Sequence, residues 1–412
     1  MEFEPLFSNG VLIMTKNIND VLETLSKDCE QVLPKGSLKS KLFKKKRLKI
    51  KLGADPTTPD LHLGHSVVLE KLRQFQDLGH EIIFIIGDFT AKIGDPTGRS
   101  KTRPPLSEQE IKKNAETYFE QVGKILDLKK AFIRYNSEWL SKLSLEDFIK
   151  IAAKTTISRI LERDDFKRRM REGGSIGMHE LFYPILQAYD SVFLQADVEV
   201  GGTDQTFNLL VGRHLQEQYG QEPQIVMTLP LLEGLDGKLK MSKSYENYIG
   251  LKEDPKEVFG KLMSVSDELM WRYYHLLLEK TDAEIKKMQN EVVKENLHPM
   301  ELKKKMAFNV VKKFWSEKEA MQSQENFEAL FQKHDYSKAK EIALSKKIAN
   351  PVWIIDLLRG VGAITTSSEG KRLIEAGAVK VDDEVVKDFK TKITWKSGMV
   401  IKVGKHRIYR LI

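Results

Sequence analysis

The pattern of hydrophobic and polar residues in the first half of the chain changes repeatedly between the period of a strand and that of a helix. Leu48, Ile50 and Leu52 alternate with lysines, which predicts a strand. Over residues 62–79 the apolar positions recur at helical spacing, which predicts a helix. Residues 81–87 are almost continuously apolar, as is typical of a central parallel strand covered on both faces.

Further elements repeat this order of strand and helix. Ser107 and Glu110 have the spacing of a capping box, which predicts that a helix begins there. Residues 198–200 and 225–232 are strand candidates. Strands that alternate with helices predict the α/β fold class, with a Rossmann-like, doubly wound parallel sheet.

The second half of the chain has a different pattern. Residues 254–331 are helical in pattern, and Leu302, Met306, Val310 and Phe314 recur every four residues as a core face would. Two short helices and two β-rich stretches are predicted beyond them, at residues 352–359, 368–376, 378–386 and 399–412. The sequence therefore predicts an α/β domain, a helical domain, a linker and a small α+β domain, over residues 1–247, 248–335, 336–348 and 349–412.

Composition and charge narrow the class of protein. The chain has 412 residues and a formal net charge of +8, and residues 351–412 hold 12 Lys and Arg against 7 Asp and Glu, a balance of +5. This basic bias in one terminal domain favours a nucleic-acid partner. A solvated surface is the alternative explanation for any single basic run, including residues 39–51.

One cysteine excludes an internal disulfide and a cysteine-cluster metal site. No apolar run approaches the ~18–20 residues of a membrane helix, so we expect a cytoplasmic protein without a membrane partner.

The loop after the first predicted strand is the first candidate for chemistry. It lacks the G-x-G-x-x-G motif of dinucleotide sites and reads Asp-Pro-Thr-Thr-Pro-Asp-Leu-His-Leu-Gly-His over residues 55–65. His62 and His65 lie on one side of the first helical turn, where free amides and the helix dipole favour anions. Gly64 would let a flat base or sugar approach the backbone. Two partly exposed histidines, or a histidine pair that binds a metal, are the alternatives.

A second motif strengthens the case for a phosphate site over these alternatives. Lys240 and Lys243 lie in the stretch Lys-Met-Ser-Lys-Ser, which follows a predicted strand and turn. Two lysines in a small loop can neutralise the charge that grows as pyrophosphate leaves. A lysine-rich loop alone is usually solvated surface, but the pair of motifs, in this order and some 175 residues apart, is far more specific than either.

The two motifs resemble the signatures of class I aminoacyl-tRNA synthetases. Over nearly its whole length the chain is similar to the bacterial tyrosyl-tRNA synthetases. The stretches that carry this resemblance are GADPTTPDLHLGH, IGDPTG, FYPILQAYD, VGGTDQTFN and KMSKS, at residues 53–65, 93–98, 182–190, 200–208 and 240–244. The resemblance implies a catalytic Rossmann-like domain, a helical domain that contacts the anticodon and a C-terminal S4-like RNA-binding domain. The related tryptophan enzymes lack the S4-like part.

The resemblance also implies roles for individual residues. Tyr183, Gln187 and Asp190 have the spacing of one helix face, and the family uses the first two, with Asp95, to bind the amino group of tyrosine. Asp190 matches the residue that reads the tyrosine hydroxyl. Gln205 matches a residue that lies near the tyrosine carboxylate. The residues implied to bind ATP are Asp55, Thr57, Gly64, Gly202, Asp204 and Lys243. The residues implied to take part in catalysis are His62, His65, Lys240, Lys243, Arg99 and Arg103, and Lys101 lies in the same loop as the two arginines.

The implied substrates are L-tyrosine, ATP with Mg²⁺, and tRNA(Tyr), acted on by a homodimer without a structural metal. One position departs from the family, because Lys51 stands where many members have a tyrosine that contacts the substrate hydroxyl. Its ammonium could donate to that hydroxyl or point to solvent. Two other classes of protein stay open: a small nucleotidyltransferase, which would have no use for the lysine motif or an RNA-binding tail, and a non-catalytic RNA-binding protein on the same scaffold.

Overall fold

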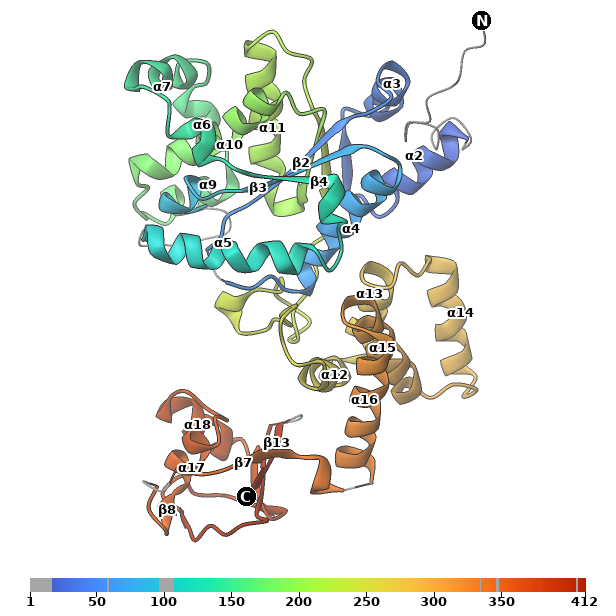
Figure 1. The fold of residues 1–412 in the computed structure, drawn as a ribbon, viewed down its shortest axis with the longest axis vertical. Coiled ribbons are helices and arrows are strands. Elements are labelled where there is room, and N and C mark those ends of the chain that lie inside the picture. The colour runs from blue at the N-terminus through green and yellow to red at the C-terminus, as the bar shows by residue number, and fades with distance from the viewer. Residues whose placement is uncertain (1–16, 58, 96–106, 334, 346–347, 405–406) are drawn as a thin grey trace, which may run out of the picture. The chain divides into compact units, whose positions relative to one another are not determined.

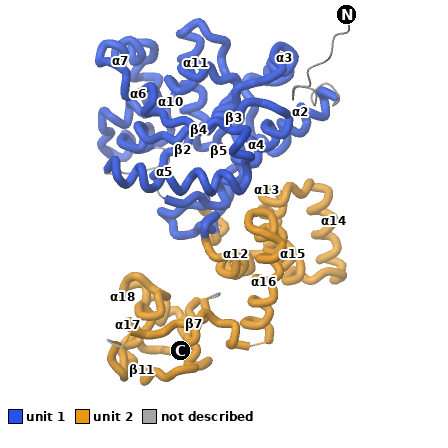
Figure 2. The backbone as a smooth tube through the Cα atoms, in the orientation of Figure 1, with its two compact units in different colours: residues 1–234, 240–252 blue, residues 235–239, 253–412 orange. Residues whose placement is uncertain are grey.

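The computed structural model describes residues 17–57, 59–95, 107–333, 335–345, 348–404 and 407–412 (Figure 1). The chain divides into two compact units, which Figure 2 colours separately. Unit 1 comprises residues 1–234 and 240–252, and unit 2 comprises residues 235–239 and 253–412. The lysine motif at residues 240–244 therefore belongs to unit 1.

Unit 1 is built on a six-stranded sheet of order β1-β6-β5-β2-β3-β4. The strands are β1 (Gln31–Leu33), β2 (Lys49–Ala54), β3 (Glu81–Ile86), β4 (Ala131–Tyr135), β5 (Val198–Gly202) and β6 (Ile225–Leu229). All neighbours pair in parallel except β1, which is antiparallel to β6. The strand order reverses between β2 and β5, and an open α/β sheet binds its ligands at the carboxyl ends of the strands beside such a point.

Helices surround this sheet (Figure 1). They are α2 (Ile18–Ser26), α3 (Ser37–Lys44), α4 (Leu63–Asp77), α5 (Glu108–Val122), α6 (Ser137–Leu140), α7 (Leu145–Ala152), α8 (Ile157–Ile160), α9 (Asp164–Arg171), α10 (Met178–Leu194) and α11 (Thr206–Gln218). Ile83 and Ile85 of β3 pack in one buried cluster with Trp139 of α6 and Leu186 of α10. The alternate residues of β3 point to the opposite face and are buried as well. Both faces of β3 are covered, as its apolar run predicts.

The helix ends match the sequence signals closely. Nδ1 of His65 accepts a hydrogen bond from the backbone N–H of His62 at 3.2 Å, at the start of α4. The capping box of α5 is present, because Oγ of Ser107 accepts from the N–H of Glu110 and Oε2 of Glu110 accepts from the N–H of Ser107. The predicted α/β class and these two helices are confirmed.

Unit 2 has a helical part and a small α+β part. The helices are α12 (Pro255–Ser264), α13 (Asp267–Leu276), α14 (Asp282–Val293), α15 (Pro299–Phe314) and α16 (Glu317–Phe327). Leu302, Met306, Val310 and Phe314 are buried on α15, as their spacing predicts. Beyond them α17 (Ile354–Gly360) and α18 (Ser367–Glu375) accompany a five-stranded sheet of order β10-β9-β12-β13-β7.

The strands of this C-terminal sheet are β7 (Lys340–Ile342), β9 (Val379–Val381), β10 (Glu384–Val385), β12 (Val400–Val403) and β13 (Arg407–Leu411). Asp382 and Asp383, both with a positive φ, form the turn between β9 and β10. Two features differ from the sequence prediction. Strand β7 lies inside the predicted linker and pairs in parallel with β13. Two further short strands, β8 (Val352–Trp353) and β11 (Lys392–Ile393), pair with each other in a separate sheet. In the chain, β8 comes just before α17, and β11 follows β10.

Candidate active site

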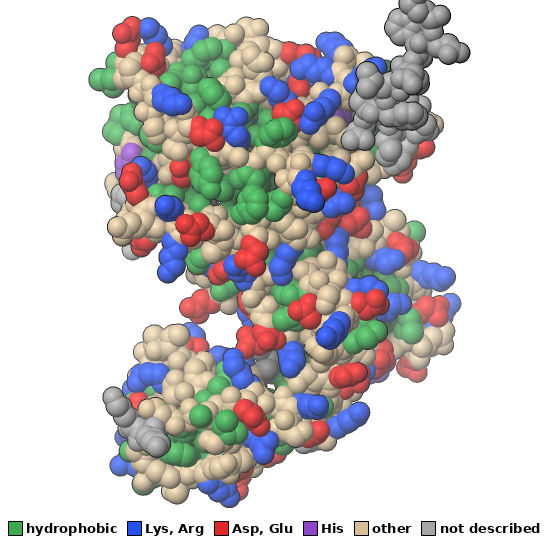
Figure 3. Space-filling model, viewed as in Figure 1, with side chains coloured by type: hydrophobic (Ala, Val, Ile, Leu, Met, Phe, Trp, Pro, Cys, Tyr) green, Lys and Arg blue, Asp and Glu red, His purple; other side chains and the backbone are tan. Residues whose placement is uncertain are grey.

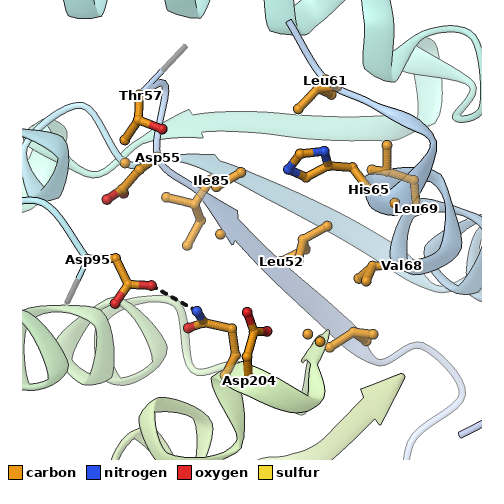
Figure 4. Close-up of a pocket in the computed structure, with 18 of the residues that line it drawn as sticks. Leu52, Asp55, Thr57, Leu61, His65, Val68, Leu69, Ile85, Asp95 and Asp204 are labelled. Atoms are coloured by element: carbon orange, nitrogen blue, oxygen red, sulfur yellow. Dashed lines mark hydrogen bonds between the residues drawn. The ribbon is translucent and has the colours of Figure 1, made fainter. Parts of the chain in front are cut away.

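A cavity of about 360 Å³ opens at the carboxyl ends of the parallel strands of unit 1. Every predicted site residue that the structure describes lines it: Asp55, Thr57, His62, Gly64, His65, Asp95, Tyr183, Gln187, Asp190, Gly202, Asp204, Gln205, Lys240 and Lys243. Figure 4 shows Asp55 and Asp95 on one side of the cavity and His65 on the other. Arg99, Lys101 and Arg103 lie outside the described residues.

The two histidines lie in contact at the start of α4. Their ring centroids are 3.9 Å apart, and because Nδ1 of His65 accepts from the backbone of His62, the proton of the neutral His65 ring is on Nε2. Burial lowers the pKa of His65 to about 4 and holds the pKa of His62 well below its ordinary value, to which the nearby lysines contribute. Both rings are therefore neutral hydrogen-bond donors at neutral pH. Gly64 leaves room beside them, since a Cβ there would lie 2.9 Å from Nδ1 of His62.

The lysine motif is held against the same helix start. The segment after the motif is joined to the start of α4 by two backbone hydrogen bonds of 2.9 Å. The N–H of Leu63 donates to the carbonyl of Ile249, and the N–H of Leu251 donates to the carbonyl of Leu61. The Nζ atom of Lys240 lies 2.6 Å from Asp204, and that of Lys243 lies 3.0 Å from Asp60.

Asn247 fixes the loop that carries these lysines. Its Oδ1 accepts from the N–H of Ser242 at 2.8 Å, and its Nδ2 donates to the carbonyl of Lys240 at 3.3 Å. Met241 is buried between the two lysines and anchors the loop. The two motifs, far apart in the sequence, thus line one cavity with two neutral imidazoles and two cations.

Asp55 is a half-buried residue whose carboxyl receives two hydroxyl donors. Oδ1 accepts from Thr90 at 2.7 Å and Oδ2 accepts from Tyr183 at 3.0 Å. Burial raises the pKa of Asp55 to about 7, although these hydrogen bonds favour the charged form. The resemblance assigns Asp55 to ATP and Tyr183 to the amino acid, and their hydrogen bond makes the two residues neighbours.

Asp95 lies in a network that the sequence reasoning did not include. Its two oxygens accept from Arg163 at 3.1 Å and from Gln205 at 2.8 Å. The guanidinium of Arg163 is buried and also donates to Asp165 at 2.8 Å and to Asn208 at 3.0 Å. Asn208 in turn donates to Oε1 of Gln205 at 2.9 Å. Arg163 therefore holds two of the predicted tyrosine-binding residues, one directly and one through Asn208.

Asp190 lies on the buried face of α10, with two donors directed at it. Nε1 of Trp139 donates to Oδ1 at 2.7 Å, and Nδ2 of Asn136 donates to Oδ2 at 3.4 Å. Burial raises the pKa of Asp190 to about 7, against the opposing effects of Lys51 and of these two donors. Such a carboxyl is placed to accept one further hydrogen bond from a ligand.

Comparison with known proteins identifies the family. Residues 44–332 match the family model for tRNA synthetases class I (W and Y). A tyrosine–tRNA ligase of Aquifex aeolicus is 48% identical over 391 residues, covering 95% of this chain and 98% of its own. Another, from Legionella pneumophila (strain Paris), is 50% identical over 393 residues with the same coverage.

The chain belongs to the tyrosine–tRNA ligase family.

The resemblance expected from the sequence motifs is thus confirmed, and so is the class I fold. A solved structure agrees on the fold alone: a C-terminally truncated mitochondrial tyrosyl-tRNA synthetase of Aspergillus nidulans superimposes with a TM-score of 0.62 at 24% identity, covering 77% of this chain and 94% of that chain.

In this tyrosine–tRNA ligase family member Lys51 takes neither of the two expected positions. Its side chain is fully buried, and its Nζ donates to Oε1 of Glu199 at 2.8 Å, to Oγ of Ser191 at 2.7 Å and to the carbonyl of Gln187 at 3.1 Å. All three ammonium protons are thereby used within the protein.

The residues that sequence reasoning missed share one property. Arg163, Trp139 and Asn136 are buried, and each donates a hydrogen bond to a predicted site residue 51–68 residues away in the sequence. Glu199 is also buried, and it accepts from Gln187, 12 residues away. A buried polar residue amid apolar neighbours is the one signal that could have drawn attention to them. Among the described residues, no group of three or more His, Cys, Asp or Glu side chains could hold a metal ion. No helix in the described part of the chain has the length and apolar composition to cross a membrane.

Proposed function

We infer that the chain is a tyrosine–tRNA ligase, which activates L-tyrosine with ATP and transfers the tyrosyl group to the 3′ end of tRNA(Tyr). The observation that carries this inference is that one pocket has two chemically different ends. One end holds the buried acceptor Asp190, and the other holds His62, His65 and the two signature lysines. A phenol and a triphosphate need such different surroundings, and the bacterial relatives are ligases of this name. We also propose that it acts in the cytoplasm.

In the first step a carboxylate oxygen of tyrosine attacks the α-phosphorus of ATP. A bond forms between oxygen and phosphorus, the bond to the bridging oxygen breaks, and pyrophosphate leaves with the electron pair. The tyrosine carboxylate is already ionised, so the step needs no general base. The rate enhancement then comes from positioning and from electrostatic stabilisation of the phosphate oxygens. ATP enters as its magnesium complex, and the metal is part of the substrate.

We assign the neutral imidazoles of His62 and His65 as donors to the α-phosphate oxygens. Lys240 and Lys243 would stabilise the leaving pyrophosphate together with Arg99 and Arg103. Lys240 and Lys243 pair with Asp204 and Asp60 in the structure, so ATP would compete with these carboxylates for the two ammonium groups. Asp204 is then free to accept from the ribose hydroxyls.

At the other end of the pocket, Asp190 would accept a hydrogen bond from the phenol of tyrosine. A site built to bind a hydroxyl rejects an analogue without it, because its buried polar group is left unpaired. Asp95, Tyr183 and Gln187 would surround the amino group, and Gln205 would lie near the carboxylate.

ATP–pyrophosphate exchange with each of the twenty amino acids tests this function. Exchange should depend on tyrosine and be nearly absent with phenylalanine. Exchange driven by tryptophan, or by no amino acid, would contradict it. The two other classes of protein give different outcomes, because the non-catalytic RNA-binding protein would show no exchange and the nucleotidyltransferase would not require an amino acid.

Unit 2 would bind the tRNA. In its helical part, five lysines line a hollow between α13, α14 and α15, at residues 280, 287, 305, 312 and 313. A concave surface of this charge suits a phosphate backbone, so we assign it to the anticodon arm. The C-terminal α+β part, with its net charge of +5, would contact another arm as an S4-like domain. Reversing Lys287 and Lys312 to glutamate should weaken tRNA binding and flatten its dependence on salt, while tyrosine activation persists.

We propose that the enzyme is a homodimer formed through unit 1. The edge strand β4 exposes Phe132 and Tyr135, and α7 exposes Leu145 and Ile149. Figure 3 shows hydrophobic side chains gathered on the face of unit 1 seen in that view. An exposed apolar surface beside an open sheet edge is typical of a protein interface. Light scattering should give twice the chain mass for the wild type and the chain mass for Phe132→Glu, whereas Val293→Glu, at an exposed valine of unit 2, stays dimeric.

A further inference from the structure

Beneath the amino-acid end of the pocket lies a buried pair of opposite charges. Lys51 of β2 and Glu199 of β5 are directly opposed in register on neighbouring parallel strands, and their exposed fractions are 0% and 1%. Their Nζ and Oε1 atoms are 2.8 Å apart. A buried ion pair is seldom more stabilising than apolar residues of the same volume, so its presence here calls for a reason other than stability.

Glu199 acts as an acceptor on both of its oxygens. Oε1 accepts from Lys51 and from Nε2 of Gln187, the latter at 3.3 Å. Oε2 accepts from Oγ of Ser191 at 3.0 Å and from Nε2 of Gln224. An ionised carboxylate has no proton to donate, so it can bind only the nitrogen end of the Gln187 amide.

This restriction fixes the orientation of the Gln187 side chain. With its nitrogen bound to Glu199, the amide oxygen Oε1 is turned away from the carboxylate, and it has no hydrogen-bond partner among the described residues. Gln187 lines the pocket, so this oxygen is the acceptor that remains for a ligand. A buried acceptor without a partner is costly in the free protein and attracts a donor, the more so a charged one.

Lys51 holds the Glu199 carboxylate in place against Gln187, because its Nζ lies 2.8 Å from Oε1, the same oxygen that accepts from the Gln187 amide. Lys51 also donates to the carbonyl of Gln187, so it holds the backbone of the same residue.

We propose that Lys51 and Glu199 are a positioning pair, which orients the Gln187 amide so that its oxygen accepts a hydrogen bond from the ammonium group of the amino-acid substrate. This inference rests on the proposed function, because it takes tyrosine as the occupant of the pocket. It also explains why a lysine stands at position 51, where its own ammonium does not reach the ligand.

The test compares two ligands that differ only in the ammonium group: tyrosine and its desamino analogue, 3-(4-hydroxyphenyl)propionate. Their dissociation constants are measured by calorimetry for the wild type and for Glu199→Gln. A glutamine at position 199 can donate as well as accept, so the orientation of Gln187 is lost. The preference for tyrosine over the analogue should shrink about tenfold or more, the size expected for a hydrogen bond to a charged group. The KM for ATP should stay within twofold.

Asp197→Asn is the matched control. Asp197 is also a buried acid paired with a lysine, 2.6 Å from Nζ of Lys45, but it does not line the pocket. It should change the melting temperature and leave the preference between the two ligands unchanged. If Glu199→Gln alone folds poorly because Lys51 is left unpaired, the double variant Lys51→Met/Glu199→Gln removes both charges and should lose the same preference.

A Glu199→Gln variant, or the double variant, that discriminates the ligands as well as the wild type would overturn the positioning role. Tyrosine-dependent exchange by the wild-type enzyme distinguishes a failure of the positioning role from a failure of the proposed function. If the wild-type enzyme shows no tyrosine-dependent exchange, the proposed function is wrong. If it does and the variants keep their preference for tyrosine, only the positioning role is wrong.

Discussion

The hydroxyl of Tyr183 donates a hydrogen bond to Oδ2 of Asp55 across 3.0 Å, and so joins helix α10 to the loop that follows β2. These two elements carry the two halves of the proposed reaction, since α10 holds the proposed tyrosine-binding residues Tyr183, Gln187 and Asp190, and the loop leads to the histidines. Thr90 completes the junction by donating to the other oxygen of Asp55. The carboxyl of Asp55 thus joins the two halves of the pocket through side-chain hydrogen bonds.

Tyr183→Phe should impair both halves through this contact. Leaving an oxygen of the Asp55 carboxyl without its donor costs about 1–3 kcal/mol, so we expect kcat/KM in the exchange reaction to fall by about tenfold. Tyr189→Phe is the control, because Tyr189 is on the same helix and does not line the pocket. Equal kinetics for the two variants would argue against a role for the junction.

Asp190→Asn should change the pH dependence of stability. Burial raises the pKa of Asp190 to about 7, above its unfolded value near 4, so the folded state holds a proton that the unfolded state has lost. The carboxyl is neutral and harmless below about pH 4, and its cost to stability grows as the pH rises to about 7.

We therefore expect the unliganded Asn variant to melt several degrees above the wild type at pH 8 and close to it at pH 4.5, measured by scanning fluorimetry. Asp20→Asn, which removes an exposed carboxyl, should show no such divergence with pH. The Asn variant should at the same time discriminate less well between tyrosine and phenylalanine, because the acceptor for the phenol is weaker.

Arg163→Met should raise the KM for tyrosine about tenfold or more and leave the KM for ATP within twofold, since Asp95 loses the guanidinium that holds it. The melting temperature should fall too, because Asp165 is left buried without its charged partner. The double variant Arg163→Met/Asp165→Asn should recover part of the melting temperature but not the KM. Lys167→Met, at an exposed position of α9, is the control. If the double variant recovered both the melting temperature and the KM for tyrosine, the role of Arg163 would be structural only.

Lys243→Ala should slow tyrosine activation by about 10²–10³-fold, the typical loss for one preorganised group that stabilises transition-state charge. Asp60→Asn removes only the partner of that lysine in the free enzyme and should cost less than tenfold. Lys238→Ala, at an exposed lysine close by in the sequence, should activate tyrosine normally. Presteady-state measurement of adenylate formation separates these cases, and a wild-type rate for Lys243→Ala would remove the mechanism.

Gly87→Ala should displace the side chains of Asp55 and Thr90 and so disrupt the hydrogen bond between them. A Cβ at this position would overlap Oδ1 of Asp55 and Oγ1 of Thr90, so both side chains would have to move. We expect about 1–3 kcal/mol of lost stability and a loss of exchange activity. Gly53→Ala, on the adjacent strand with open space around its Cβ, should keep its melting temperature. A Gly87→Ala enzyme with normal stability and activity would show that Asp55 tolerates displacement.

The sequence predicted those parts of the fold that depend on local pattern. Helix α4, the buried strand β3 and the capping box at Ser107 follow from spacing and apolar runs. The meeting of the two signature motifs in one pocket follows from topology, because both flank the carboxyl edge of a parallel sheet. Strand β1 and strand β7 were not predicted, since each has three residues, too few to show a period.

The supporting residues of the pocket could not be predicted, because their roles exist only in three dimensions. Trp139 reaches Asp190 across 51 residues of sequence, and Arg163 reaches Asp95 across 68. Neither lies in a motif, and neither has a local pattern that differs from an ordinary core or surface residue. Lys51 was noticed as a departure, but its buried partner Glu199 emerged only from the pairing of β2 with β5.

The surroundings of Asp190 have a consequence for redesign of the substrate range. A pocket for a tyrosine analogue with a bulky or apolar para substituent would have no use for the carboxyl, yet removing it alone would strand the indole N–H of Trp139 and the amide of Asn136 in the interior. Libraries that vary these three positions together should yield folded variants with altered amino-acid preference more often than libraries that vary position 190 alone.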